Sequence, residues 1–379
     1  MHKHSPIQCI VPPHMLEGIA TKGTEAQKKL AVNTLKTSEQ MRGQRRALAD
    51  FAAAAFRVAA TGGKERIVYD AKNGSSLPGT PVRREGDAAT ADVAVNEAYD
   101  GSGVTYDLYN AVYQRNSIDG NGMRLDSTVH FQKGYDNAFW NDEQMVYGDG
   151  DENLPPEERL FNRFTIAIDV IGHELTHGVT QFEAKLVYSQ QPGALNESMS
   201  DVFGSLVKQY QLKQTAAQAD WIIGAGLLTK NVNGVGIRSM KAPGTAYNDP
   251  VLGKDPQPAH MKYYVNTVGD NGGVHINSGI PNHAFYIASM EIGGNAWEKA
   301  GKIWYVTLRD KLTSTSKFQD CAALTYQTAG ELFGAGSLEQ QAVKKGWTDV
   351  GLSVEGGGTT EPGGCLEAIL RFLGLAPAR

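Results

Sequence analysis

The chain has 379 residues, of which 41% are hydrophobic and 20% are charged, so it holds enough apolar residues for two or three packed units. Its formal net charge of −5 argues against nucleic acid or an anionic membrane as the main partner. The three cysteines (Cys9, Cys321 and Cys365) lie far apart without metal-type spacing, which excludes a complete disulfide framework.

The N-terminal part differs in charge from the rest. Residues 1–50 carry eight Lys or Arg and four Asp or Glu, a balance of +4 that leaves −9 for the remainder. Residues 14–58 are predicted to be mostly helical, with Thr37 or Ser38 as an N-cap. A basic segment beside an acidic body is typical of a docked, detachable piece.

Residues 64–150 have a residue pattern typical of β-strands, interrupted by one predicted helix around 90–115. Asn73-Gly74 indicates a hairpin, and "STVHF" and "QMVYGDGD" continue the strand pattern. From about residue 160 onward the chain is predicted to be helical, with Gly-rich loops. After "SVEGGGTTEPGGC", a linker by composition, a short amphipathic helix is expected in the tail.

The stretch "VIGHELTHGV", residues 170–179, lies in a segment whose apolar residues recur at helical steps. His173 and His177 are four apart, so both imidazoles project from one helix face and can reach one ion. Glu174 lies beside that ion, where it can take a proton from a zinc-activated water. A surface helix with incidental histidines is the competing reading, and the motif alone does not decide between them.

A zinc site of this kind needs a third protein ligand. Glu183 is one candidate, but its class of protease needs a glycine at position 180, where this chain has Thr180. Glu197, twenty residues after His177 on another predicted helix, is the better candidate. Asp201 falls on the same face of that helix, where it can accept the outward N–H of a ligand histidine.

Farther on, "DNGGVHINSGI" places His275 in a Gly-rich turn, five residues after Asp270. A lone loop histidine is usually only solvated. Beside a zinc site, an Asp–His pair could present an imidazolium to the oxyanion that forms as water attacks a peptide carbonyl.

At this point the sequence resembles the thermolysin family of zinc endopeptidases, from about Arg66 to Leu352. The matching blocks follow one another in order and spacing: "GVTYDLY", "NAFWNDEQMVYGDGD", "HELTHGVT", "GALNESMSDVFGSLV", "IRSM" and "DNGGVHINSGI". Six ordered blocks are far more specific than any single motif.

The resemblance implies a role for each matching residue. The zinc ligands would be His173, His177 and Glu197, with Asp201 supporting His173. The chemistry would belong to Glu174 as general base and to His275, Asp270 and Tyr188 as stabilisers of the tetrahedral intermediate. Substrate contacts would come from Asn137, Ala138 and Trp140 on a strand edge and from Arg238 beside a pocket for an apolar side chain.

The resemblance also implies an α+β, thermolysin-like fold of two lobes, with the zinc helix between them. The expected units are a short helical propeptide at 1–50, a β-rich lobe at 60–186, a helical lobe at 187–352, and a linker with a short tail at 353–379. The expected enzyme cleaves peptide bonds on the N-terminal side of bulky hydrophobic residues.

The chain departs from the calcium-rich members of the family. Asp169 and Asp220 match two ligands of their paired calcium site, but Lys208 replaces a shared glutamate. Ile222, Ala225 and Gly226 replace further ligands. The double calcium site is therefore not expected, and the Lys208 ammonium is expected to pair with the two remaining carboxylates. A single calcium ion elsewhere is left open.

The N-terminal stretch "CIVPPHMLEGIA" resembles the short precursor segment of protealysin-like members, which implies a zymogen that is cut within 38–58. Cys9 is either a fourth zinc ligand that displaces water or a small packed residue in a segment that blocks the cleft sterically. The leader is a poor signal peptide. Secretion is expected by family analogy, with a cytoplasmic location as the alternative.

The remaining expectations concern partners and the competing function. Polypeptide substrates and the chain's own residues 1–50 are the expected partners, with no nucleic acid and no membrane span, and the protein is expected to be a monomer. The competing hypothesis is a catalytically silent zinc-binding or interaction protein on the same scaffold, which would lack Glu174 or His275.

Overall fold

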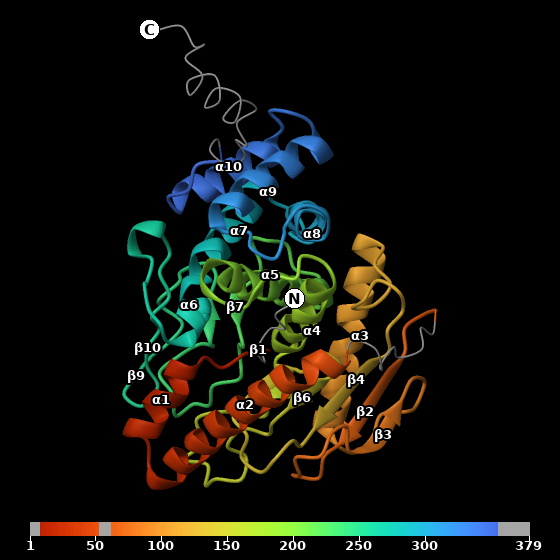
Figure 1. Cartoon of the computed structure of the whole chain (residues 1–379), viewed down its shortest axis with the longest axis vertical. Helices are drawn as coiled ribbons and strands as arrows, with labels where there is room; N and C mark the ends of the chain where they lie inside the picture. Colours follow the sequence, from red (N-terminus) through yellow and green to blue (C-terminus); the bar gives the residue numbers. More distant parts are fainter. Residues whose placement is uncertain (1–7, 53–61, 355–379) are drawn as a thin grey trace, which may run out of the picture.

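The N-terminal segment, residues 8–52, lies across the front of the molecule in the computed structural model, which describes residues 8–52 and 62–354 (Figure 1). It consists of β1 (Gln8–Cys9), α1 (Pro13–Lys22) and α2 (Glu25–Ala52). Pro13 suits the first turn of α1 because that position needs no backbone donor. Met15, Leu16 and Ile19 form the buried face of α1, so this segment packs as part of the protein core.

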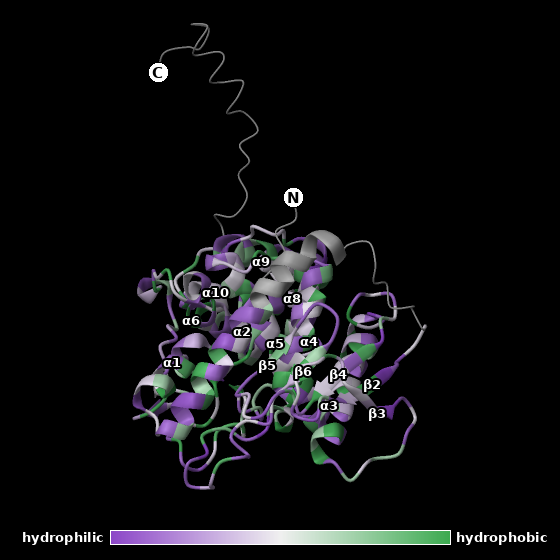
Figure 2. Cartoon of the chain, turned by 60° about the horizontal axis from the view of Figure 1, so that its bottom comes forward, coloured by the Kyte–Doolittle hydropathy of each residue, from purple (hydrophilic) through white to green (hydrophobic). Residues whose placement is uncertain are grey.

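A six-stranded sheet, in the order β1-β5-β6-β4-β2-β3, forms the β-rich part of the molecule. Strand β1 pairs antiparallel with β5, so the N-terminal segment completes one edge of the sheet. At the other edge, β3 is hydrophilic (Figure 2) and ends on the exposed Arg84, as suits an edge that must not pair with other chains. Besides β1, the sheet contains β2 (Arg66–Asp70), β3 (Thr80–Arg84), β4 (Leu125–Val129), β5 (Ala138–Trp140) and β6 (Met145–Tyr147).

Helix α3 (Val93–Tyr113) confirms the helix predicted around 90–115. Its N-cap is Asp92, whose carboxylate accepts hydrogen bonds from the amides of Ala94 and Val95 at 2.9 and 3.3 Å. The helix contacts both β2 and β4, so it covers the sheet beside the helical part of the molecule.

Two long helices, α4 (Ile168–Phe182) and α5 (Gln190–Leu212), lie at the centre of the molecule (Figure 1). They touch through small residues. A Cβ on Gly204 would lie 2.4 Å from the carbonyl oxygen of Asp169, and one on Gly172 would lie 3.0 Å from Val207. Because only glycine permits this approach, the faces of α4 and α5 that carry polar residues are held close together.

The C-terminal part is mainly helical, with short strand pairs beside it. The two-residue strands pair as β7 with β8 and as β9 with β10. The remaining elements are β7 (Ile222–Ile223), β8 (Arg238–Ser239), β9 (Asn248–Asp249), β10 (Gly253–Lys254), α6 (Asp270–Asn277), α7 (Gly279–Ile292), α8 (Ala300–Asp310), α9 (Phe318–Phe333) and α10 (Leu338–Asp349), with single 3-10 turns at Phe164–Ile166 and Met261–Tyr263. Among the described residues, no helix is both long and apolar enough to cross a bilayer.

Some local expectations differ from the structure. Thr37 and Ser38 do not cap a helix but lie inside α2, because their hydroxyls reach partners on the body and do not compete with the helix backbone. Thr37 donates to Gln132 at 3.0 Å, and Ser38 bonds the Tyr135 hydroxyl at 3.1 Å. The hairpin at Asn73-Gly74 exists, but its strands are joined by residues 71–79 and not by a two-residue turn. The predicted tail helix and Cys365 lie outside the described residues.

A buried ammonium joins α5 to the start of α4. Lys208 Nζ lies 2.8 Å from Asp169, 2.9 Å from Asp220 and 2.6 Å from the Ile222 carbonyl oxygen. Burial alone would lower the pKa of Lys208, but the carboxylate of Asp169 outweighs it and the pKa is raised. The predicted pairing of Lys208 with both carboxylates is therefore present.

Replacing Lys208 should expose what this cation does. Lys208→Met leaves the Asp169 carboxylate buried without its partner, so we expect the free energy of unfolding to fall by about 3–5 kcal/mol. Lys208→Glu adds a third carboxylate, and its loss of stability should be partly recovered by added calcium, unlike that of Lys208→Met. Thermal unfolding with and without calcium measures both effects.

The exposed Lys230 provides the matched control, since Lys230→Met should leave stability unchanged. Equal stabilisation of all three variants by calcium would show that the ion acts elsewhere on the protein.

Candidate active site

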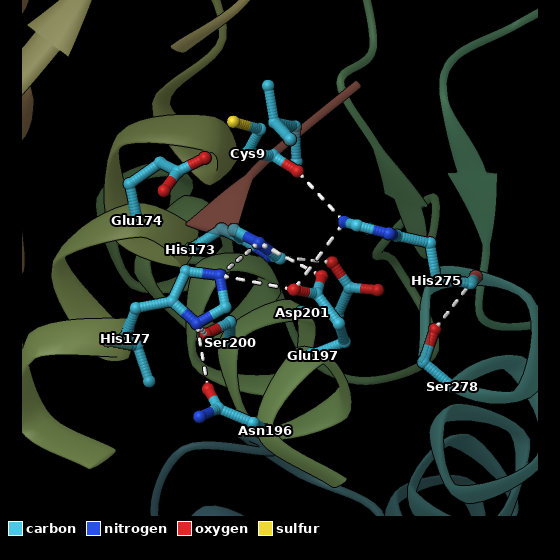
Figure 3. A network of polar contacts seen from close by, with 12 residues as sticks. Cys9, His173, Glu174, His177, Asn196, Glu197, Ser200, Asp201, His275 and Ser278 are labelled. Atoms are coloured by element: carbon cyan, nitrogen blue, oxygen red, sulfur yellow. Dashed lines mark hydrogen bonds and ion pairs between the residues drawn. The ribbon is translucent and has the colours of Figure 1, made fainter. Parts of the chain in front are cut away.

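Two histidines on α4 face each other at the centre of the site. His173 and His177 are completely buried, and their Nε2 atoms lie 3.0 Å apart (Figure 3). Burial, reinforced by His173, lowers the pKa of His177 far below its usual range, so the ring stays neutral. Two imidazoles with converging Nε2 atoms are a favourable donor pair for zinc.

Each ring is held by its other nitrogen. His173 Nδ1 lies 2.8 Å from Asp201, and His177 Nδ1 lies 2.8 Å from the Asn196 side-chain oxygen and 2.9 Å from the Ser200 hydroxyl. These partners orient both rings so that Nε2 points into the site. Sequence reasoning found Asp201 but missed Asn196 and Ser200, although both stand in the quoted "NESMSD" block.

Glu197 on α5 supplies the third donor. Its carboxylate lies 3.5 Å from the Nε2 atoms of both His173 and His177. One ligand atom from each of the three residues falls within 4.8 Å of the others, and Glu197 Oε2 has no hydrogen-bond partner among the described residues. Such an orphaned buried oxygen fits a site built for a cation. The rejected candidate, Glu183, instead pairs with Arg115.

Asp201 connects this cluster to the substrate side of the site. Besides His173, its carboxylate accepts two hydrogen bonds of 2.8 Å from Arg238 and one of 2.8 Å from Asn282. Burial by itself would raise the pKa of Asp201, but the Arg238 guanidinium outweighs it and the pKa is lowered. Asp201 therefore stays ionised although it is completely buried.

Glu174 approaches the cluster from the sheet side. One carboxylate oxygen accepts a hydrogen bond of 3.1 Å from the Trp140 amide, so the edge strand β5 fixes its position. Burial, followed by the charge of Glu197, raises the pKa of Glu174 well above its usual range. A carboxyl group with a raised pKa is suited to exchanging a proton with a substrate near neutral pH.

His275, Tyr188 and Asp270 close the site from the helical part. His275 Nδ1 lies 2.6 Å from Asp270, and its Nε2 lies 3.2 Å from the Tyr188 hydroxyl, which also contacts Glu197. Burial opposes charge on His275, but the carboxylates of Asp270 and Glu197 together outweigh it and raise its pKa to about 9. The charged imidazole is therefore favoured at neutral pH.

The N-terminal segment fills the groove between these parts. The Ile10 amide donates to the carbonyl oxygen of Ala138 at 3.3 Å, and Arg238 donates to the Ile10 carbonyl at 3.0 Å. The Asn137 side chain bonds both the amide and the carbonyl oxygen of Val11, at 3.0 and 3.3 Å. The predicted substrate contacts are thus occupied by the chain's own backbone.

The Cys9 thiol points away from the three converging donors. It lies 4.0 Å from the Ser38 hydroxyl and belongs to an apolar cluster with Phe131, Tyr135, Phe139 and Val146. The group of described residues that could hold a metal contains His173, His177 and Glu197 without this cysteine. This position corresponds to the second of the two expectations for Cys9, a small packed residue.

Known proteins share this arrangement. Residues 20–181 match the family described as "Thermolysin metallopeptidase, catalytic domain", and residues 184–352 match "Thermolysin metallopeptidase, alpha-helical domain". An extracellular metalloprotease of Pectobacterium carotovorum subsp. carotovorum is 49% identical over 353 residues, which cover 93% of this chain and 98% of that protein. A thermolysin of Alicyclobacillus acidocaldarius subsp. acidocaldarius is 41% identical over 302 residues, which cover 77% of this chain and 52% of that protein.

Among solved structures, the precursor of protealysin, a metalloproteinase from Serratia proteamaculans, is 52% identical with a TM-score of 0.82, over 91% of this chain and 100% of that chain. These findings confirm the expected thermolysin-like α+β fold, and the His-His-Glu cluster fits the zinc on which the family depends. Taken with the geometry of α4 and α5, they show that the chain belongs to the thermolysin family of zinc-dependent metalloendopeptidases.

Proposed function

We propose that the full chain is the latent precursor of an endopeptidase that cuts internal peptide bonds before bulky hydrophobic residues. The observation that carries this proposal is the peptide-like position of residues 8–11, which run through the groove between β5 and α6. Ile10, whose carbonyl is held by Arg238, is completely buried in the main apolar core. An extended backbone with a buried apolar side chain is what a substrate would present there.

In this reaction water adds to the carbonyl carbon of the substrate, the carbon–nitrogen bond breaks, and a carboxylate and an amine are released. Zinc held by His173, His177 and Glu197 would supply the Lewis acidity that polarises this carbonyl and activates the water. Glu174 accepts the proton of the attacking water and delivers it to the departing nitrogen. The Trp140 amide keeps the Glu174 carboxylate in place for both transfers.

His275 and Tyr188 act on the opposite side of the reacting carbonyl. The cationic imidazole and the phenol hydroxyl, 3.2 Å apart, can both donate toward the negative charge that develops on its oxygen. Asp270 holds the imidazole charged and oriented. Both Glu174 and His275, whose absence the catalytically silent alternative would require, are present beside the His-His-Glu cluster, so that alternative is not favoured.

Substrate alignment would come from the edge strand and from Arg238. Asn137 and Ala138 offer backbone-type hydrogen bonds to an extended peptide, as they do to Val11 and Ile10 here. Arg238 is locked by Asp201, so its remaining donor is preset for one substrate carbonyl. Release of the N-terminal segment would then open a groove whose binding groups need little rearrangement.

Removal of residues 1 to about 50 is the activating step that this arrangement requires. The expected cleavage region, 38–58, overlaps α2, which continues to Ala52. A peptide bond within 38–52 can enter a protease groove only after local unwinding of that helix. The extracellular name of the Pectobacterium relative supports export of the active enzyme.

Glu174→Gln removes the proton carrier but keeps its shape. We expect a folded, zinc-loaded protein whose activity on casein is lower by about three orders of magnitude or more. With zinc, the wild type should lose about its first fifty residues and then digest casein, whereas the variant should stay whole. Intact mass over time, together with zinc content by atomic emission, measures both.

A variant that binds zinc normally and still matures like the wild type would show that Glu174 is not the base. If wild type and variant both stay whole, trimming with trypsin separates a precursor that needs another protease from a scaffold without activity.

Docking of the N-terminal segment should depend on pH through His14, which bonds the Tyr247 hydroxyl at 2.9 Å. Burial, against the pull of Asp270 and together with the charges of His275 and Arg238, lowers the pKa of His14 from 6.5 to about 4. The undocked segment therefore binds a proton more readily than the docked one. Docking should be strongest above pH 6.5 and weaken as pH falls toward 4, by at most about 300-fold.

Hydrogen exchange of the α1 amides, measured in a Glu174→Gln background between pH 7.5 and 5, tests this pH dependence. His14→Gln keeps a hydrogen-bonding side chain without the titration, so its exchange, corrected for intrinsic rates, should depend less on pH. Identical profiles for the two proteins would assign any acid sensitivity to groups other than His14.

A further inference from the structure

Residues 9–11 make an ordered series of backbone contacts with the residues that the reaction uses. His275 Nε2 lies 3.0 Å from the Cys9 carbonyl oxygen (Figure 3). The next carbonyl along the chain, that of Ile10, accepts from Arg238 at 3.0 Å. The following residue, Val11, is bonded through both its amide and its carbonyl oxygen by Asn137. The segment thus has one defined register in the groove.

This register places a single peptide bond at the reactive position. The carbonyl that reacts must face His275 and Tyr188, and among the described residues of the segment the Cys9 carbonyl is the one that contacts His275. Its nitrogen partner is the Ile10 amide, which donates to the Ala138 carbonyl on β5, the same strand whose Trp140 amide holds the Glu174 carboxylate. The bond between Cys9 and Ile10 therefore lies between the proposed proton carrier and the proposed oxyanion donors.

We propose that Cys9–Ile10 is itself a cleavage site, which the zinc-loaded chain cuts in its own groove before the rest of the N-terminal segment leaves. This inference rests on the proposed function. Water adds to the Cys9 carbonyl carbon, the bond to the Ile10 nitrogen breaks, and a Cys9 carboxylate and an Ile10 amine result. Solvent supplies the water, and no other reactant is needed.

The two products of this cut are held to different extents. On the Cys9 side, the described chain is the two residues of β1, which pair with β5 and place Cys9 in a small apolar cluster. On the Ile10 side, Met15, Leu16 and Ile19 are at most 2% exposed, and the Gln27 side chain donates to the Glu158 carbonyl at 2.6 Å. The chain from Ile10 onward should therefore stay docked after residues 1–9 have left.

A docked product explains why the cut alone does not activate the enzyme. The new Ile10 amine remains beside Glu174, with its carbonyl still bonded to Arg238 and its neighbour Val11 to Asn137. The binding groups that a substrate needs stay occupied. Activation then requires the second, larger removal, so maturation proceeds in two steps with an inactive intermediate.

The experiment follows the N-terminus of the zinc-loaded full chain over time by intact mass and N-terminal sequencing. We expect a species that begins at Ile10 before any casein activity develops. Because the bond lies in the chain's own groove, its half-time should not change over a tenfold dilution. A half-time that lengthens on dilution would mean that one molecule cuts another, which overturns the proposal.

Variants isolate the bond. Ile10→Asp places a carboxylate in the main apolar core, where Ile10 is completely buried, so the species that begins at residue 10 should be lost. Glu17→Gln, an exposed position on α1, is the matched control and should retain it. Glu174→Gln should yield none of it.

A second readout needs neither metal nor activity. In the metal-free Glu174→Gln chain, the Val11 amide should exchange slowly because it donates to Asn137, and Asn137→Ala should release it. Fast exchange of that amide in the unsubstituted groove would contradict the register. If trypsin-trimmed enzyme digests casein but Ile10 never becomes an N-terminus, this inference fails alone. If the trimmed enzyme is inert, the proposed function fails, and the exchange result then decides the register.

Discussion

The site depends on one buried charge, the carboxylate of Asp201. It orients the ligand His173, fixes two donors of Arg238 and accepts from Asn282 on α7, so three elements meet at a single side chain. A completely buried carboxylate is tolerated only when its oxygens are fully hydrogen-bonded, and here a guanidinium also balances the charge. His173, a candidate metal ligand, and Arg238, the arginine proposed to bind substrate, are therefore mechanically coupled through this residue.

Close packing of α4 against α5 gives Asp201 its position. Gly172 and Gly204 let the helix backbones approach, and a methyl group on Gly204 would collide with the Asp169 carbonyl oxygen at 2.4 Å. His173 and His177 on α4 thus face Glu197 and Asp201 on α5 directly, with no other segment lying between the two helices. Packed helices hold the positions of such donors more precisely than loops do, because the backbone that carries each side chain is itself fixed by packing.

The sequence predicted the parts of the site that follow from helical periodicity. His173, His177, Glu197 and Asp201 converge because spacings of four residues define a face, and that rule survives folding. Hydrogen-bond partners that meet only through tertiary contacts could not be predicted from the sequence in this way. Ser200 binds His177 only because α5 lies so close to α4, and the Thr37 hydroxyl bonds Gln132 across an interface that no local pattern specifies. For the same reason Thr37 was wrongly predicted as a helix cap. A threonine hydroxyl can cap a helix or bond a distant side chain, and the local sequence does not distinguish the two.

The cation at the junction of α4, α5 and residues 220–222 is the ammonium of Lys208 and not a bound ion. This difference determines how stability at the junction responds to the solution. A bound ion stabilises a protein by mass action, so its contribution rises and falls with the free ion. The ammonium of Lys208 is covalently attached, and its effective concentration at Asp169 and Asp220 is constant. The stability of this junction therefore does not depend on dilution or on the free calcium concentration, and a chelator cannot remove its cation.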